Sequence, residues 1–263
     1  HQQALAWLNQ TFDPPGNDLE VNQPDFRDRR MGWYGLHLLG WLILTAAVLP
    51  LAATAPAPTE SIGAWRAWGG LVLAPFVSLA AIKLLNTAVP AENLGRLMIG
   101  GALGFWLLIT GAVWLSVIGK LPRPRRQDLL IGLLGFACLW AGFGAMAQVV
   151  WLPWLLTGQR LLLWALIAIA CIPWFLASNM MPVATWRSRL VWWLGQTVAI
   201  VGGLILAMVA VPNLGFLAIM LPAFPVLLAV FLTLSRQARS VWGSALACAA
   251  TLSWLIVVPF PVL

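Results

Sequence analysis

Long uninterrupted apolar segments run through most of this 263-residue chain, and they decide which folds are available to it. Two of the longest cover residues 161–176 and 198–211. Only 9% of the residues are charged, against about 25% in a soluble globular domain, so lipid must cover most of the surface. Because lipid offers the backbone no hydrogen-bond partner, only helices and closed barrels can span it. Barrel strands would alternate polar and apolar residues, whereas these runs are continuous, so the sequence predicts helices.

Eight segments are long and apolar enough to cross the roughly 30 Å hydrocarbon core of a bilayer. They cover residues 33–53, 67–87, 96–118, 129–150, 161–180, 190–211, 214–234 and 241–261. The prediction is therefore an all-α fold, a polytopic membrane helix bundle of about eight transmembrane helices over residues 31–263. Two prolines, Pro222 and Pro225, predict a kink in the seventh span.

Two further patterns predict how the helices pack and where they meet the membrane surface. Gly100 and Gly104 form a GxxxG motif, whose usual meaning is close helix packing. Tryptophans cluster near the predicted joints, which is typical of an interfacial aromatic belt. The tryptophans assigned to this belt are Trp65, Trp68, Trp151, Trp154, Trp186, Trp192 and Trp193.

The N-terminal thirty residues differ from the rest of the chain. Residues 1–12 carry apolar side chains at helical spacing, which predicts a short amphipathic helix. This helix lies either on the membrane surface or at the end of a soluble domain that precedes it. Residues 13–30 hold three prolines among charges and are predicted to be a polar linker. The chain begins with His1, which suggests a fragment or a processed form of a longer protein.

Lysine and arginine residues predict the orientation of the bundle. Nine of them fall in the odd-numbered loops between predicted spans, and six fall in the tail and the even-numbered loops. The positive-inside rule then places residues 120–126 in the cytoplasm and the N-terminal tail outside the cytoplasm. Arg123, Arg125 and Arg126 are predicted to contact anionic lipid headgroups, with an acidic protein partner as the alternative. The net charge of +7 is accordingly assigned to membrane lipids and not to nucleic acid.

Ionisable groups are almost absent from the predicted membrane interior. All eight carboxylates lie in the tail, in loops or at span edges, and none follows Asp128. Only two histidines, His1 and His37, are present. Ion-coupled transport and metal catalysis normally need such groups within the bundle. We therefore expect no catalytic residue, no metal site and no cofactor in this chain, and we expect the three scattered cysteines to act as small buried hydrophobes.

Four polar side chains at membrane depth form the candidate site. They are Lys83, Gln148, Asn179 and Gln196. One interpretation is that Lys83 extends to the headgroups and that the three amides each hydrogen-bond a neighbouring helix. The other is that all four line one polar cavity.

One segment resembles a known family. Residues 1–15, HQQALAWLNQTFDPP, resemble the last helix of an α/β-hydrolase domain, and residues 151–178 resemble the multi-helix membrane region that follows this domain in some bacterial dienelactone-hydrolase-like proteins. The resemblance implies an upstream hydrolase domain and a bacterial inner (plasma) membrane. No position of this chain matches the family's nucleophile or acid.

Three functions are consistent with these patterns. The first is a membrane module that anchors an extracytoplasmic hydrolase domain and presents a lipophilic substrate to it. The second is an uncoupled permease or flippase for a small lipophilic molecule, which a shared polar cavity would favour. The third is a structural subunit of a membrane complex. The oligomeric state does not follow from the sequence.

Overall fold

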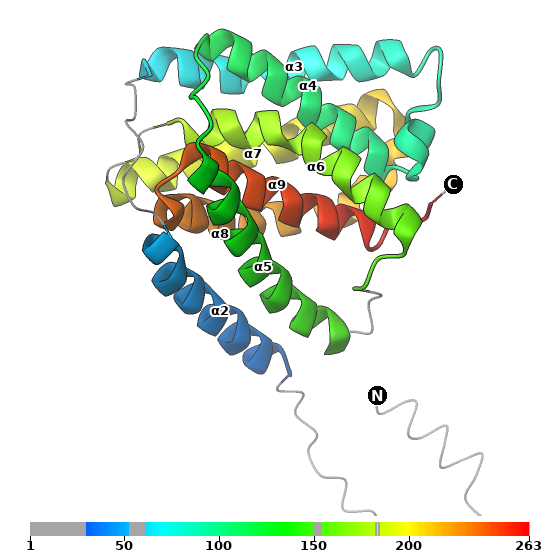
Figure 1. The fold of residues 1–263 in the computed structure, drawn as a ribbon. Helices are drawn as coiled ribbons and strands as arrows, with labels where there is room; N and C mark the ends of the chain where they lie inside the picture. The colour runs from blue at the N-terminus through cyan, green and yellow to red at the C-terminus, as the bar shows by residue number, and fades with distance from the viewer. Residues whose placement is uncertain (1–29, 53–61, 150–153, 182, 184, 263) are drawn as a thin grey trace, which may run out of the picture. The chain divides into compact units, whose positions relative to one another are not determined.

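The computed structural model describes residues 30–52, 62–149, 154–181, 183 and 185–262. The predicted N-terminal helix and linker lie outside these residues. The described residues form helices and two 3₁₀ segments, with no strand among them. In chain order they are α2 (Arg30–Ala52), α3 (Ala64–Leu85), η1 (Ala91–Arg96), α4 (Gly100–Ile118), α5 (Arg126–Val149), α6 (Gly158–Asn179), α7 (Trp186–Ala210), η2 (Pro212–Met220), α8 (Ala223–Ala238) and α9 (Val241–Val257). The all-α prediction is confirmed (Figure 1).

Six of the described helices are long and apolar enough to cross a membrane, and η2 with α8 makes a seventh candidate. α9 has 17 residues and is shorter than each of the six spanning helices. The predicted kink in the seventh span is confirmed, since η2 and α8 meet at 55°. Pro222 precedes α8 and Pro225 lies in its first turn, where the missing N–H has no intrahelical partner to lose.

Polar contacts between helix ends show which ends lie together. Ser240 at the start of α9 donates to Asp128 at the start of α5 (2.6 Å). Asn179 at the end of α6 donates to Ser244 of α9 (2.9 Å). We call this end, which holds the starts of α3, α5, α7 and α9 and the ends of α4, α6 and α8, the basic end. At the opposite end, Arg160 of α6 donates to the last carbonyls of α9, including Val258 O (2.8 Å).

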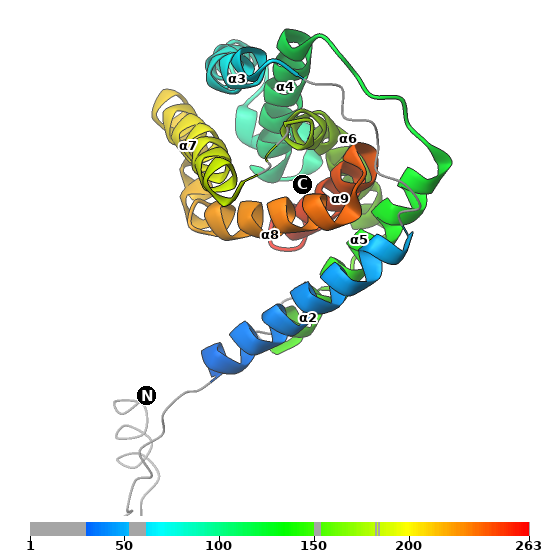
Figure 2. The same cartoon turned by 90° about the vertical axis from the view of Figure 1, so that its left-hand side faces the viewer.

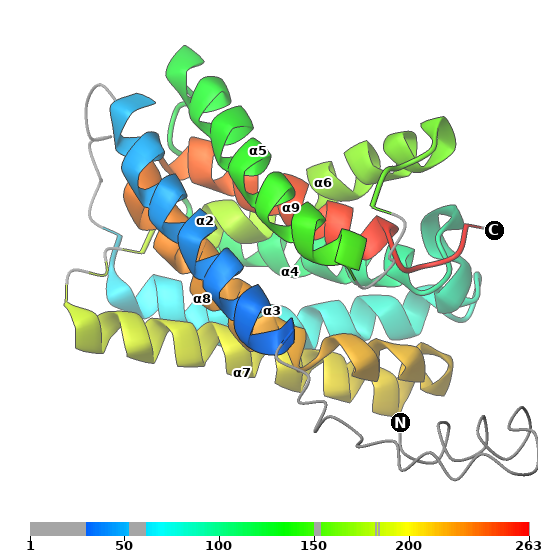
Figure 3. The same cartoon turned by 90° about the horizontal axis from the view of Figure 1, so that it is seen from below.

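Six helices form a closed ring of neighbours. In order around the ring they are α3, α4, α6, α9, α8 and α7, which returns to α3. Figure 2 shows these six helices arranged around the ring. α5 packs on the outside of α9, and α2 lies antiparallel along α5, with Trp41 beside Gly142 and Leu49 beside Gly135 (Figure 3). Within the ring, α6 packs extensively against both α4 and α9.

Glycines set the spacing between α4 and α6. Gly104 faces Ile167, and seven residues further along both helices Gly111 faces Trp174. This constant register means that α4 and α6 run parallel. A Cβ atom at Gly111 would lie 2.5 Å from the carbonyl carbon of Pro173, which is backbone and cannot move aside. Gly104 therefore takes part in close packing, as the GxxxG motif predicts, and Gly111 marks the tightest approach of the two helices.

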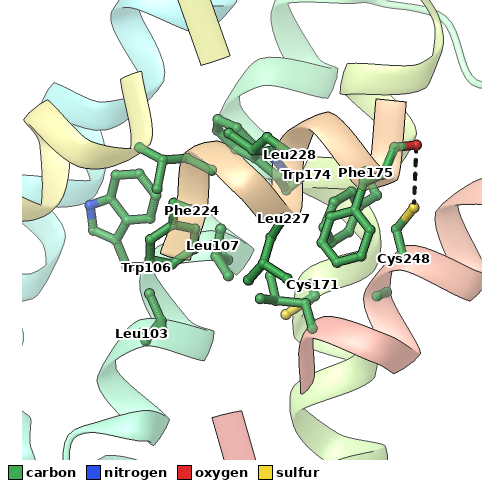
Figure 4. Close-up of a cluster of buried hydrophobic side chains, with 14 of the residues drawn as sticks. Leu103, Trp106, Leu107, Cys171, Trp174, Phe175, Phe224, Leu227, Leu228 and Cys248 are labelled. Carbon is green, nitrogen blue, oxygen red and sulfur yellow. Dashed lines mark hydrogen bonds between the residues drawn. The ribbon is translucent and has the colours of Figure 1, made fainter. Parts of the chain in front are cut away.

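Large aromatic and aliphatic side chains fill the ring. Residues of α4, α6, α8 and α9 point toward one another there, among them Trp106, Trp174 and Phe224 (Figure 4). Trp192 is 1% exposed and Trp154 is 4% exposed, so their assignment to an interfacial belt was wrong. Their flat rings pack in the core, and Trp192 donates its indole N–H to Ser178 O at the end of α6 (3.3 Å). Trp65 and Trp186 are exposed, as a belt requires.

Candidate functional site

A pocket of about 280 Å³ opens at the basic end of the ring. It lies over the end of α6, between the start of α7, the end of α8 and the start of α9. Its polar and charged lining residues are Asn179, Arg189, Ser235, Arg236, Arg239, Ser240 and Ser244, and its apolar ones are Met181, Val183, Leu232 and Val241. We call it the basic pocket.

The basic pocket exists because α6 ends before its neighbours do. Trp192, six residues inside α7, hydrogen-bonds the penultimate residue of α6, so the first turns of α7 extend beyond the end of α6. On the other side, Arg239 has a left-handed backbone (φ 48°) and ends α8. The next residue, Ser240, already caps α9 by accepting the N–H of Gly243 (2.9 Å). This tight corner between α8 and α9 places Arg239 in the lining of the basic pocket.

A hydrogen-bonded network of small polar residues forms the floor of the pocket. Asp128 accepts the Ser240 hydroxyl with one oxygen and the Arg125 N–H with the other (both 2.6 Å). Ser244 donates to Ser240 O (2.6 Å) and accepts from Asn179. Because these bonds join α5, α6 and α9, the floor is fixed by three helices.

The electrostatics of the basic pocket favour an anion. Arg189 comes from α7, Arg236 from the last turn of α8 and Arg239 from the corner before α9. The start of α9 adds the positive end of a helix dipole. Asp128 is the one carboxylate that the described residues contribute to the basic end, and both its oxygens are engaged. Within the described part of the chain, the lining of the basic pocket holds three arginines and no carboxylate, so its charge favours an anionic ligand.

A second, much smaller pocket adjoins the first and shares Asn179 and Leu232 with it. Its volume of about 10 Å³ is roughly that of one water molecule. Ser178 and Gln196 line it among aromatic and leucine side chains, and the Ser178 hydroxyl donates to Gln196 Oε1 (2.6 Å). Gln196 is 3% exposed, and its amide lines this smaller pocket.

The structure brings two of the four predicted cavity residues together. Asn179 and Gln196 line the same small pocket. Lys83 is exposed in the last turn of α3, near the opposite end, and lines neither pocket. The side chain of Gln148 lies outside the described residues.

The predicted headgroup contacts Arg123, Arg125 and Arg126 are exposed at the basic end, just before and at the start of α5. They do not line the basic pocket. The arginines that do are Arg189, Arg236 and Arg239, which the sequence places in loops between predicted spans without predicting a site for them. Their common signal was that they fall in loops on one side of the membrane.

Binding is the chemistry that this arrangement supports. Among the described residues, no group of three or more His, Cys, Asp or Glu side chains could hold a metal ion. His37 lies away from the basic pocket, with its Nε2 3.3 Å from Gly142 O. Comparisons with protein-family models, with curated proteins and with solved structures find no match to this chain, so the interpretation of the site depends on its own residues.

Proposed function

We propose that this integral membrane protein binds the anionic head of a lipid-like molecule at its basic end. The observation that carries the proposal is the basic pocket itself, where three arginines surround a floor of hydroxyl and amide groups. Four apolar residues complete the wall and suit the part of an amphiphile next to its head. The sequence already suggested a lipophilic ligand, and the basic pocket adds the expectation that its head is negatively charged.

Removing two arginines tests this function. In purified protein, Arg236→Gln with Arg239→Gln is expected to weaken saturable binding of an anionic phospholipid by at least about tenfold, since each charged hydrogen bond contributes about 1.5–3 kcal/mol. Native mass spectrometry or fluorescence titration in neutral detergent measures the affinity. Arg123→Gln with Arg126→Gln removes the same charge from the same end but outside the pocket, and should change the affinity less than twofold. Equal losses in the two double variants would contradict the proposal in favour of general surface attraction.

We also propose that the basic end faces the cytoplasm of a bacterial cell. In the full sequence, nine Lys and Arg residues belong to that end and six to the tail and the opposite end. The positive-inside rule then places the tail and the end of α9 outside the cytoplasm. A periplasmic phosphatase fused after Leu263 is expected to be active and a fluorescent protein fused there to be dark. The reverse result would overturn this orientation.

The attached hydrolase domain remains a separate proposal carried by the sequence. Residues 1–15 lie outside the described residues, so the resemblance is all that supports it. An upstream reading frame that encodes a nucleophile turn supports the proposal, and one without it contradicts it.

A further inference from the structure

We infer that the group recognised in the basic pocket is a terminal phosphate, a phosphomonoester, in preference to a phosphodiester or a carboxylate. The inference depends on the proposed function, because it names the head of the ligand that the pocket binds. The same terminal phosphate could belong to a lipid or to a soluble molecule, and the experiment below separates these sources.

The positions of the arginines support this choice. Arg189 comes from α7, whereas Arg236 and Arg239 come from the end of α8 and the corner after it, so the arginines reach the pocket from two elements. A guanidinium group presents a planar fork of donors that matches the oxygens of phosphate. A terminal phosphate has three free oxygens pointing in different directions, whereas a phosphodiester has two and a carboxylate has two in one plane. Arginine donors that come from both α7 and the end of α8 therefore match the phosphomonoester best.

The start of α9 adds a fourth set of donors. The first N–H groups of a helix have no intrahelical acceptor, and Val241, the first residue of α9, lines the pocket. The Ser240 hydroxyl is already committed to Asp128, which orients the cap of this helix. Helix starts of this kind are established phosphate sites when further cations are present.

The size and the charge of the pocket agree with this ligand. Its volume of about 280 Å³ lies just below the roughly 300–1,000 Å³ of pockets that enclose a whole drug-sized ligand, so it suits a head and its first carbons. A phosphomonoester carries a charge of about −1.5 to −2 at neutral pH, against −1 for the other two heads. That larger charge offsets more of the positive charge that Arg236 and Arg239 bring to the pocket.

The test compares four probes on the purified protein in neutral detergent. They are dioleoyl phosphatidic acid, dioleoyl phosphatidylglycerol, oleate and inorganic phosphate. Phosphatidic acid is expected to bind at least about tenfold more tightly than phosphatidylglycerol or oleate, because it gains one charged hydrogen-bonded oxygen. Arg236→Lys with Arg239→Lys keeps both charges but loses the planar forks. This variant is expected to lose most of the preference for phosphatidic acid while its affinity for phosphatidylglycerol changes about twofold or less.

A pH series supplies a second measurement. Between pH 5.5 and pH 7.5 the phosphomonoester gains its second charge, with a pKa of about 6, so its advantage over phosphatidylglycerol should increase. Among the described residues, the charged groups that face the pocket are Arg189, Arg236 and Arg239, with Asp128 hydrogen-bonded to Ser240. The phosphatidylglycerol series measures any contribution from these protein groups.

The outcomes separate this inference from the proposed function. If phosphatidylglycerol or oleate binds as tightly as phosphatidic acid, or if the preference does not depend on pH, the terminal phosphate is wrong but the lipid-binding function stands. If inorganic phosphate alone binds as tightly as phosphatidic acid, the phosphate is right and the lipid is wrong. If no probe binds saturably, both are wrong.

Discussion

Replacing Gly111 with leucine is expected to separate α4 from α6 and to destabilise the whole ring. A Cβ atom at this position would overlap the backbone of Pro173 and Trp174, which cannot rotate away as a side chain can. Overpacking in a core usually costs about 1–3 kcal/mol, and a clash with backbone should reach or exceed the upper value. We expect a loss of at least about 3 kcal/mol in the free energy of unfolding, measured by denaturant titration in detergent.

A matched substitution is available in α7. An added Cβ at Gly202 would meet no atom within 4 Å, so Gly202→Leu adds the same side chain without the same clash. It should leave the free energy of unfolding within about 0.5 kcal/mol of the original value. Equal losses for the two leucine variants would show that α4 and α6 do not approach as closely as the structure shows.

Asp128→Ala is expected to be the most destabilising change among the polar residues of the basic end. Asp128 is 6% exposed and joins α5 to α9 through Ser240, and it also accepts the backbone N–H of Arg125. Hydrogen bonds to charged groups contribute about 1.5–3 kcal/mol each, so the free energy of unfolding should fall by about 3 kcal/mol. Denaturant titration in detergent measures the loss.

The partner of this carboxylate provides the control. Ser240→Ala removes the same bond from the other side, so the losses in Asp128→Ala and Ser240→Ala should not add in the double variant. A coupling energy above about 1 kcal/mol is expected for groups in direct contact. Strictly additive losses would mean that the two side chains act independently, and the fixed floor of the pocket would then need another explanation.

The helices were predictable from the sequence because each span has to satisfy its own backbone in lipid. The kink before α8 was predictable for a similarly local reason, since Pro222 cannot continue a hydrogen-bonded turn. Whether each tryptophan is buried or exposed does not depend on local sequence alone. Trp192 and Trp65 occur in similar sequence surroundings, yet one is buried in the ring and the other is exposed. Which neighbour receives an indole N–H is decided by helix packing.

The basic pocket could not be predicted from the sequence for a related reason. Asn179 and Gln196 could be selected because amides at membrane depth are rare, and the structure places them together. Arg236 and Arg239 looked like ordinary loop charges because charges beside span ends are common. Their role in the pocket depends on α6 ending early and on α7, α8 and α9 surrounding that end. Both features depend on how segments that are far apart in the chain pack together.

The position of α9 has a consequence for biosynthesis. This helix contacts α5, α6 and α8, and with its cap Ser240 it contributes Val241 and Ser244 to the pocket, yet the ribosome makes it after all the other described helices. Until α9 is inserted, α6 lacks the neighbour that packs against it there, and Asp128 lacks the hydrogen bond from the Ser240 hydroxyl. The basic pocket therefore stays incomplete until α9 has been made, and a protein truncated before Ser240 would reach the membrane without this pocket.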